Sequence, residues 1–418
     1  MITKADILLR AREWQLTPEV VEKDYALGWM LAAVSNHAET STKWVFKGGT
    51  CLKKCVVETY RFSEDLDFTL LPDASYSIDA LRSILADLTA WVTANSGIEF
   101  PADTIDVRQR VNKAGRTTFE ASVGYRGPLA HPGPPKIRFD LTNDERIVRP
   151  VDRRVVFHPY PDVPPGDGRV CTYSVGELVA EKLRALVERA RPRDLYDVVQ
   201  LAAIVIVPEE HAALREIARA KFAVKALDLP SASAIVDRVE SDLELHSEWE
   251  SMLKHQLPAL PPVADFVNRL GEAIAWIDEP APRPDASERT AHHRPRAPVS
   301  PRTTALRLGA GEEIVRHAGI RVWGGDVPLE AIRFAGASRL LVEFSYHGNR
   351  RIVEPYSLRR PRTGNLLLYG YEVRKDGFPT SEIRAYKVHE MSGVRILQET
   401  FTPRYDVELF ERSGTWRW

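Results

Sequence analysis

The chain has 418 residues, enough for two or three domains that each bury a core of their own. Its hydrophobic content of 44% and charged content of 28% are those of an ordinary globular protein, and a formal net charge of -1 points to no particular partner. No apolar run is long enough to span a bilayer, no signal-peptide pattern begins the chain, and three cysteines exclude a disulfide framework. We therefore expect a cytoplasmic protein with buried or idle thiols.

The first part of the chain is predicted to form a small mixed sheet flanked by helices. Apolar residues at helical spacing predict a helix that begins at Thr17, the expected N-cap. "WVFKGG" is typical of a short strand, a helix is expected over about residues 50–59, and "DLDFTLL" is the next strand. "SIDALRSILADLTAWVTANSG" predicts an amphipathic helix that stops at Gly97. "TTFEASVGY" and "KIRFDLTN" predict two further strands, and the pattern is then mainly helical to about Trp276.

The composition changes at residue 277. Residues 277–326 are rich in Pro and Arg and lack apolar periodicity over most of their length, which predicts a flexible or extended linker that gives the next module independent motion. After it, a short helix is followed by period-two segments separated by turn residues, which predict a small all-β, barrel-like module over residues 327–412. The overall prediction is an α+β protein with its first domain at residues 1–276.

Two acids stand one residue apart in "DLDFTLL", at Asp65 and Asp67. Alternate residues of a strand share a face, and like charges on one face repel, so we expect a cation between them. Carboxylate oxygens suit Mg²⁺ or Mn²⁺, which binds through one or two carboxylates and the phosphates of a substrate. Backbone amides of Gly48, Gly49 and Thr50, at a helix N-terminus, can hold those phosphates. The alternative is a solvent-facing pair of acids at a strand end.

Asp140, in "KIRFDL", supplies the third carboxylate that a two-metal phosphoryl-transfer site uses. Its neighbours Phe139 and Leu141 are typical of a buried strand. The alternative is an Asp that opens the following Thr-Asn-Asp turn. Asp65, Asp67 and Asp140 are therefore the candidate metal ligands.

At this point the chain resembles a known family. "VEKDYALGWML", "FKGGTCLKK", "RFSEDLDF", "EKLRAL" and "RPRDLYDVVQL" are similar to elements of the AbiEii/AbiGii nucleotidyltransferase toxins, a branch of the DNA polymerase β-like superfamily. The resemblance implies a polymerase β-like core with a helical subdomain, metal binding at Asp65 and Asp67, phosphate contacts from Lys182 and an active-site acid at Asp194. The predicted nucleotide-binding residues are Lys47, Gly48, Gly49, Thr50, Arg61, Ser63 and Lys182, and the predicted catalytic residues are Asp65, Asp67, Asp140, Lys182 and Asp194.

The helical residues of this set also have ordinary interpretations. Lys182 lies on a helix whose other positions are largely apolar, which favours a cleft-facing cation. The alternative is an ordinary Lys on the helix surface, paired with Glu181 or Glu188. Asp194 follows Pro192 and can simply cap its helix. Asp197, one turn further on, is expected at the surface.

The strands after the linker resemble a WYL domain, an Sm-like β-barrel that binds ligands and regulates attached domains. The tripeptide that names that family is replaced by Leu366, Leu367 and Leu368. Aromatic and basic side chains together suit a nucleotide or a single-stranded nucleic acid. The predicted ligand residues are Tyr346, Arg350, Arg351, Tyr371 and Arg384, and the alternative is a strand module with solvated arginines.

The leading hypothesis is a metal-dependent nucleotidyltransferase toxin that moves a nucleotidyl group from an NTP to an acceptor such as tRNA. The resemblance implies a toxin–antitoxin or phage-defence setting, Mg²⁺ or Mn²⁺ as cofactor, a separate antitoxin and regulation by the WYL-like module. The alternative is a non-catalytic regulator that senses a nucleotide or nucleic acid and binds DNA through residues 1–60. That segment shows no clear glycine-containing turn between two short helices, and the three acids would be unexplained.

Overall fold

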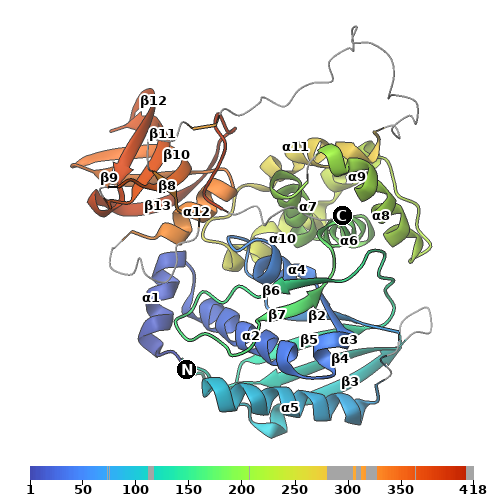
Figure 1. The fold of residues 1–418 in the computed structure, drawn as a ribbon. Helices are drawn as coiled ribbons and strands as arrows, with labels where there is room; N and C mark the ends of the chain where they lie inside the picture. The colour runs from blue at the N-terminus through green and yellow to red at the C-terminus, as the bar shows by residue number, and fades with distance from the viewer. Residues whose placement is uncertain are drawn as a thin grey trace.

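The computed structural model describes residues 1–72, 74, 76–111, 117–206, 208–279, 305–306, 312–316, 327–362 and 364–410. It has the expected α+β composition, with two β-sheets and a group of helices that lies beside the second sheet and above the first in Figure 1. Most of the predicted linker lies outside the described residues. In the part of the chain that is described, no helix has both the length and the apolar character needed to cross a membrane.

The first sheet has the strand order β3-β4-β5-β2-β1-β7-β6. Its strands are β1 (Trp44–Lys47), β2 (Asp65–Leu70), β3 (Asp106–Val111), β4 (Thr117–Gly124), β5 (Lys136–Thr142), β6 (Asp152–Val155) and β7 (Arg169–Thr172). The four predicted strands, β1, β2, β4 and β5, lie together in the middle, with β2 parallel to β5. Strands β3, β6 and β7 were not predicted: β6 and β7 have four residues each, and β3 (DVRQRV) has only two apolar residues, so none shows a clear apolar alternation.

Helices α1 (Lys4–Trp14), α2 (Pro18–Asn36), α3 (Thr40–Lys43) and α5 (Ile78–Ser96) accompany this sheet. Thr17 occupies the N-cap position of α2 without a side-chain capping bond, and Pro18 takes the first helical position. Gly97 ends α5 in the left-handed conformation, as predicted, with φ 78°. Every α2 residue from Val21 to Val34 except Lys23 is buried, so α2 cannot enter a DNA groove without unpacking.

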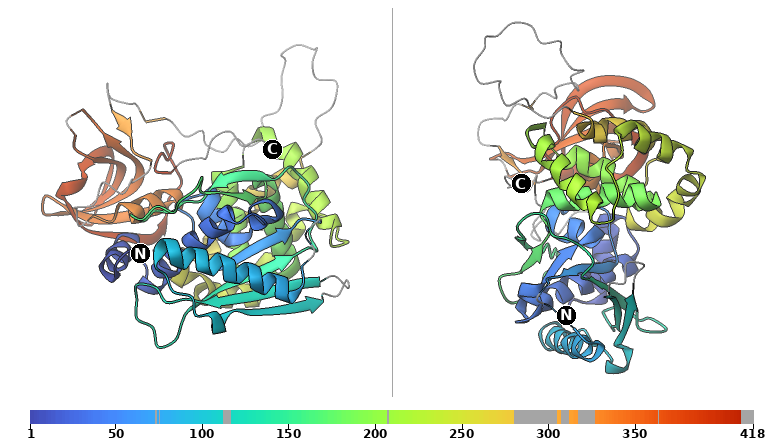
Figure 2. Two further views of the ribbon diagram at one scale, coloured as in Figure 1. Left: turned by 60° about the horizontal axis from the view of Figure 1, so that its bottom comes forward. Right: turned by 90° about the vertical axis from the view of Figure 1, so that its right-hand side faces the viewer.

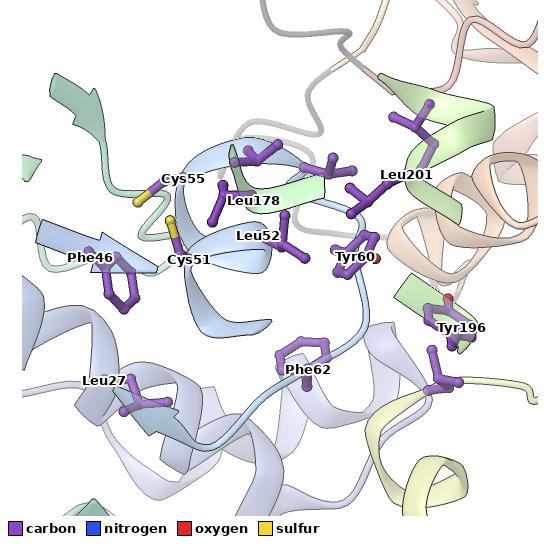
Figure 3. Packing of buried hydrophobic residues seen from close by; sticks show 14 of the residues in the cluster. Leu27, Phe46, Cys51, Leu52, Cys55, Tyr60, Phe62, Leu178, Tyr196 and Leu201 are labelled. Atoms are coloured by element: carbon purple, nitrogen blue, oxygen red, sulfur yellow. The ribbon is translucent and has the colours of Figure 1, made fainter. Parts of the chain in front are cut away.

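A helical subdomain follows the first sheet. Its helices are α6 (Val175–Arg189), α7 (Pro192–Ile204), α8 (His211–Ala223), α9 (Ala232–Ser241), α10 (Leu243–Leu253) and α11 (Val263–Ile274). Leu178 of α6 and Leu201 of α7 lie near Leu52 and Tyr60 of the preceding domain in the same apolar cluster (Figure 3). The subdomain and the first sheet therefore share one core, which fixes the helices relative to the strands.

The C-terminal module contains α12 (Leu329–Ala337) and a second sheet in the order β12-β11-β10-β9-β13, with β8 (Glu313–Ile314) paired to the end of β10. Its other strands are β9 (Leu340–Tyr346), β10 (Asn349–Arg360), β11 (Leu367–Lys375), β12 (Phe378–Lys387) and β13 (Met391–Thr400). Among the described residues β12 and β13 form the two edges and do not pair, so the sheet is open and the prediction of a closed barrel is wrong. One of the period-two segments predicted after the linker, "EIRAYKVHEMSGVRIL", belongs to two strands, β12 and β13, which are separated by a 3-10 turn at Val388–Glu390.

The C-terminal module is docked on the rest of the chain (Figure 2). Arg333 of α12 is 1% exposed, and its Nη2 lies 3.1 Å from Glu58 Oε2. Gln15 Nε2 donates to the Val394 carbonyl at 3.1 Å, and Thr400 Oγ1 donates to Asp265 Oδ2 at 3.1 Å. These contacts differ from the expectation that the module moves independently on its linker.

Candidate active site

Three carboxylates lie side by side on one face of the first sheet. Asp65 and Asp67 are separated by one residue of β2, so both point to the same face. Asp67 is the register partner of Asp140 on the parallel strand β5. The same row continues through Glu120 of β4, so acids occupy three adjacent strands. None of the Asp65, Asp67 and Asp140 side chains has a hydrogen bond or ion pair to another described residue.

The two glycines at the start of α4 are required by the backbone conformation and by the close approach of neighbouring side chains. Gly48 begins the helical segment α4 (Gly48–Cys51) with φ 77°, and a Cβ there would lie 2.0 Å from Asp67 Oδ2. A Cβ on Gly49 would lie 3.0 Å from Ser63 Oγ. The Thr50 hydroxyl donates to the Asp65 backbone carbonyl, which ties this loop to β2. The helix thus starts two residues earlier than predicted and continues as a π-helical turn, Leu52–Val56.

The electrostatics of the carboxylate row are unfavourable without a further cation. Burial raises the pKa of Asp67 to about 6, with Asp140 and Asp65 adding to the rise, although Lys47 and Lys182 oppose it. Burial also raises the pKa of Asp140. The pKa of Lys47 is raised despite its burial, because Glu181, Glu145, Asp67 and Asp140 surround it. The positive charge of Lys47 is therefore shared between the carboxylate row and the neighbouring glutamates, and its Nζ lies 3.7 Å from Glu181 Oε1.

Lys182 faces the interior of the site and is not a surface residue. Its Nζ lies 2.9 Å from Asp197 Oδ2 and 3.5 Å from Asp194 Oδ1, and both aspartates are fully buried. Arg189 holds Asp194 from the other side, through Nε to Oδ2 at 2.7 Å. Asp194 is thus fully paired, and its position supports a role in orienting Lys182 rather than as a free base.

Asp197 and Arg61 form a buried ion pair that sequence reasoning missed. Arg61 Nε and Nη2 donate to the two Asp197 oxygens at 2.7 and 2.6 Å, and Arg61 Nη1 donates to Gln256 Oε1 at 2.9 Å. Burial would raise the pKa of Asp197, but Arg61 and Lys182 lower it to about 2. Asp197 is therefore buried and not at the surface, where it was expected. The Arg61 guanidinium is used in contacts with Asp197 and Gln256, which differs from its predicted contact with the nucleotide.

A cleft of about 400 Å³ opens over the carboxylate row. Asp65, Asp67 and Asp140 line it together with Arg138, Lys136 and Arg108. Arg138 is the register partner of Asp65, so a cation lies on the strand next to the acids. The period-two pattern of "KIRFDL" places Arg138 and Asp140 on one face, and this was the available signal for Arg138.

The donor set suits a hard divalent cation, but it is not a preformed metal centre. Within the described residues no three His, Cys, Asp or Glu side chains converge closely enough to hold a metal ion. Asp65, Asp67 and Asp140 are nevertheless oxygen donors in register, with their negative charges only partly balanced by Lys47. These residues fit Mg²⁺ or Mn²⁺ by donor type and by the charge that they leave uncompensated.

The residues predicted to bind a ligand in the C-terminal module are mostly paired with neighbouring acids. Arg351 Nη1 lies 2.8 Å from Glu372 Oε2, Arg350 Nε donates to Glu343, and Arg384 Nε donates to Glu382 at 2.8 Å. The Tyr346 hydroxyl donates to Glu390 Oε2 at 2.9 Å, and Arg404 lies over the Tyr371 ring at 4.6 Å. The arginines therefore hold the sheet together, and ligand binding by this set stays a prediction.

Comparison with solved structures finds similarity to MenT4, a nucleotidyltransferase toxin from Mycobacterium tuberculosis, at 20% sequence identity and a TM-score of 0.42, over 67% of this chain and 91% of that chain. No curated protein matches. Residues 29–278, more than half of the chain, match the family described as nucleotidyl transferase AbiEii toxin of a type IV toxin–antitoxin system. This segment contains the carboxylate row, Lys182 and the glycine loop, which is the turn at Gly48 and Gly49. The chain therefore belongs to the AbiEii family of nucleotidyltransferase toxins.

Proposed function

We propose that this protein transfers a nucleotidyl group from an NTP to an RNA acceptor, with tRNA as the first candidate. The observation that supports this most strongly is the row of Asp65, Asp67 and Asp140, in register and without ion-pair partners among the described residues. The glycine loop lies against Asp67, so a phosphate chain on the loop amides would lie beside the acids. The cleft above them, about 400 Å³ in volume, has the size of a small-molecule site and can take the nucleotide.

Asp65, Asp67 and Asp140 are proposed to hold Mg²⁺ or Mn²⁺, which when bound would supply positive charge against the triphosphate. Lys47 lies next to the row, and Lys182 faces it from α6. Both lysines are positioned to offset the charge of the phosphates, while Asp194 and Asp197 keep Lys182 oriented. The Thr50 hydroxyl, which donates to the Asp65 carbonyl, would keep this loop against β2.

The reaction forms one bond and breaks another. The acceptor hydroxyl oxygen bonds to the α-phosphorus, the bond from that phosphorus to the bridging oxygen breaks, and pyrophosphate leaves. The hydroxyl proton goes to a carboxylate of the row. Asp140 is proposed for this role because it lines the open cleft and is the register partner of Asp67.

The setting proposed for this activity follows from the family. A toxin of a type IV toxin–antitoxin system acts with a separate antitoxin, and NTP and tRNA are substrates of the cytoplasm, so we place the protein there. The C-terminal module is proposed to regulate the transferase. Because it is docked through the buried Arg333, regulation would act through that contact surface and not through a freely moving module.

The test is incubation of the whole protein with each α-labelled NTP, Mg²⁺ or Mn²⁺ and total RNA. We expect label in RNA with at least one NTP, and a loss of about 10²–10³-fold or more for Asp67→Asn, since one electrostatic element of the site is removed. Asp103→Asn, at an exposed position, is the matched control and should keep wild-type transfer. Label only in protein, label nowhere, or full activity of Asp67→Asn would contradict the proposal.

A further inference from the structure

A second pocket lies away from the catalytic cleft, where the helical subdomain meets the C-terminal module. It has a volume of about 300 Å³ and is lined by residues of α7, α8 and α11 and by Arg339, which follows α12. Val199 and Ala202 contribute an apolar wall from α7. The pocket thus joins two parts of the molecule that are distant in sequence.

Two arginines line this pocket without acceptors. Arg269 of α11 and Arg339 are both partly buried, and neither has a hydrogen bond or ion pair from its side chain to any described residue. Arg269 lies over the Phe266 ring, 5.6 Å from its centroid, and its pKa is lowered to about 10 by burial and by the charge of Arg339. By contrast, the buried Arg61 and Arg333 both have carboxylate partners. A sheltered guanidinium without an acceptor is costly, so an anion is the expected occupant.

The other polar groups of the pocket agree with an anionic ligand. Trp276 is 2% exposed, and its Nε1 is a buried donor without an acceptor among the described residues. Glu272 is exposed and supplies one negative charge against the two arginines. The lining therefore keeps a positive balance and one further unused hydrogen-bond donor.

The backbone of Arg339 is held in an unusual conformation. Its φ is 59°, in the left-handed region that residues other than glycine rarely adopt. Its N–H donates to the Gly336 carbonyl at 3.2 Å, and its carbonyl accepts from Phe401 N–H at 2.9 Å. The surrounding structure thus fixes the point from which this side chain enters the pocket, as is common at functional sites.

We propose that this pocket binds a small phosphorylated ligand, with its phosphate between Arg269 and Arg339 and its apolar part against Val199 and Ala202. Guanidinium groups match phosphate oxygens in pairs of hydrogen bonds. The volume is at the lower limit of small-molecule sites, which range from about 300 to 1,000 Å³, so a mononucleotide fits better than a larger compound.

The position of the ligand couples it to the transferase. Arg269 belongs to the helical subdomain and Arg339 to the C-terminal module, so one phosphate would connect the two. The wall helix α7 also carries Asp194 and Asp197, the partners of Lys182. Occupancy would therefore stabilise both the docking of the module and the helix that orients this lysine.

The test is titration calorimetry of the full chain with inorganic phosphate and with AMP, CMP, GMP and UMP. EDTA is present throughout, so that the divalent-cation site does not contribute. We expect at least one probe to bind, and the affinity to fall by about tenfold or more in Arg269→Gln and in Arg339→Gln, since each loses a charge-assisted contact. Arg219→Gln, on the exposed side of α8, is the control and should bind like wild type.

Tighter binding of a monophosphate than of phosphate would identify a nucleotide as the ligand, and equal binding would identify free phosphate. The two arginines come from different elements, so if one variant fails to fold, the other still carries the test. Absence of binding by the wild-type protein, or wild-type affinity in the folded arginine variants, would overturn the proposal.

Discussion

The two sheets of this molecule differ in whether their charged side chains are paired. On the face of the first sheet, Asp65, Asp67 and Asp140 stand together with no ion-pair partner among the described residues. In the C-terminal sheet, by contrast, buried arginines meet carboxylates, as Arg351 meets Glu372 at 2.8 Å and Arg359 meets Glu408 at 2.9 Å. Breaking a buried ion pair destabilises the folded state, because it leaves one charge buried without a partner. Adjacent like charges destabilise the folded state unless a ligand neutralises them. We therefore propose that the first sheet carries the chemistry and that the ion pairs of the second sheet are structural.

The largest effect that this comparison predicts is on the stability of the C-terminal module. Glu372→Gln leaves Arg351 charged and nearly buried, so the free energy of unfolding should fall by about 3–5 kcal/mol. Glu399→Gln, which removes the exposed partner of Arg374, should cost no more than about 1 kcal/mol. Denaturant unfolding of both variants measures the difference. Equal, small losses would show that the pairs of this sheet are not structural.

The next prediction concerns pH. The folded pKa of Asp67, about 6, is above its ordinary value of 3.8, so the folded state holds this proton more tightly than the unfolded state does. Stability attributable to Asp67 is therefore greatest at acidic pH and is lost as pH rises from about 4 to 6, by about 1–3 kcal/mol. In EDTA, the stability of wild type relative to Asp67→Asn should fall over this range. A constant or rising difference would argue against a raised pKa of Asp67 in the crowded carboxylate row.

A smaller effect is expected at Lys182. Lys182→Ala removes a cation that faces the proposed triphosphate, so kcat/KM for the NTP should fall by about tenfold, mainly through KM, with RNA binding little changed. Lys4→Ala, at an exposed position of α1, is the control. Unchanged turnover at limiting NTP would leave Lys182 with only its contacts to Asp194 and Asp197.

The sequence predicts the local geometry of this site well. Asp65 and Asp67 share a face because a strand has period two, and the glycine loop is recognisable because Gly48 needs a positive φ beside Asp67. The buried position of Asp197, by contrast, cannot be predicted from the local sequence. Its partner Arg61 lies 136 residues away, and "LYDVVQLAAIVI" by itself is only a helix with an acid in its first turns.

The same limit applies to the C-terminal module. The alternation of side chains predicts strands β9, β10, β11 and β12, but closure of a barrel depends on whether the edge strands pair, and β12 and β13 do not. Nor does the composition of the linker show that Arg333 is buried against Glu58, 275 residues away. Both features depend on long-range packing that no local pattern encodes.

The central claim is that the unpaired carboxylates of the first sheet hold a divalent cation. The most direct measurement is the thermal unfolding of the wild-type protein and of Asp67→Asn at pH 7.5, with and without Mn²⁺. A ligand that binds only the folded state raises the melting temperature with concentration. We predict that Mn²⁺ raises the Tm of the wild type and has little effect on Asp67→Asn, which without metal should be at least as stable as the wild type. No shift in the wild type, or the same shift in both proteins, would contradict the claim.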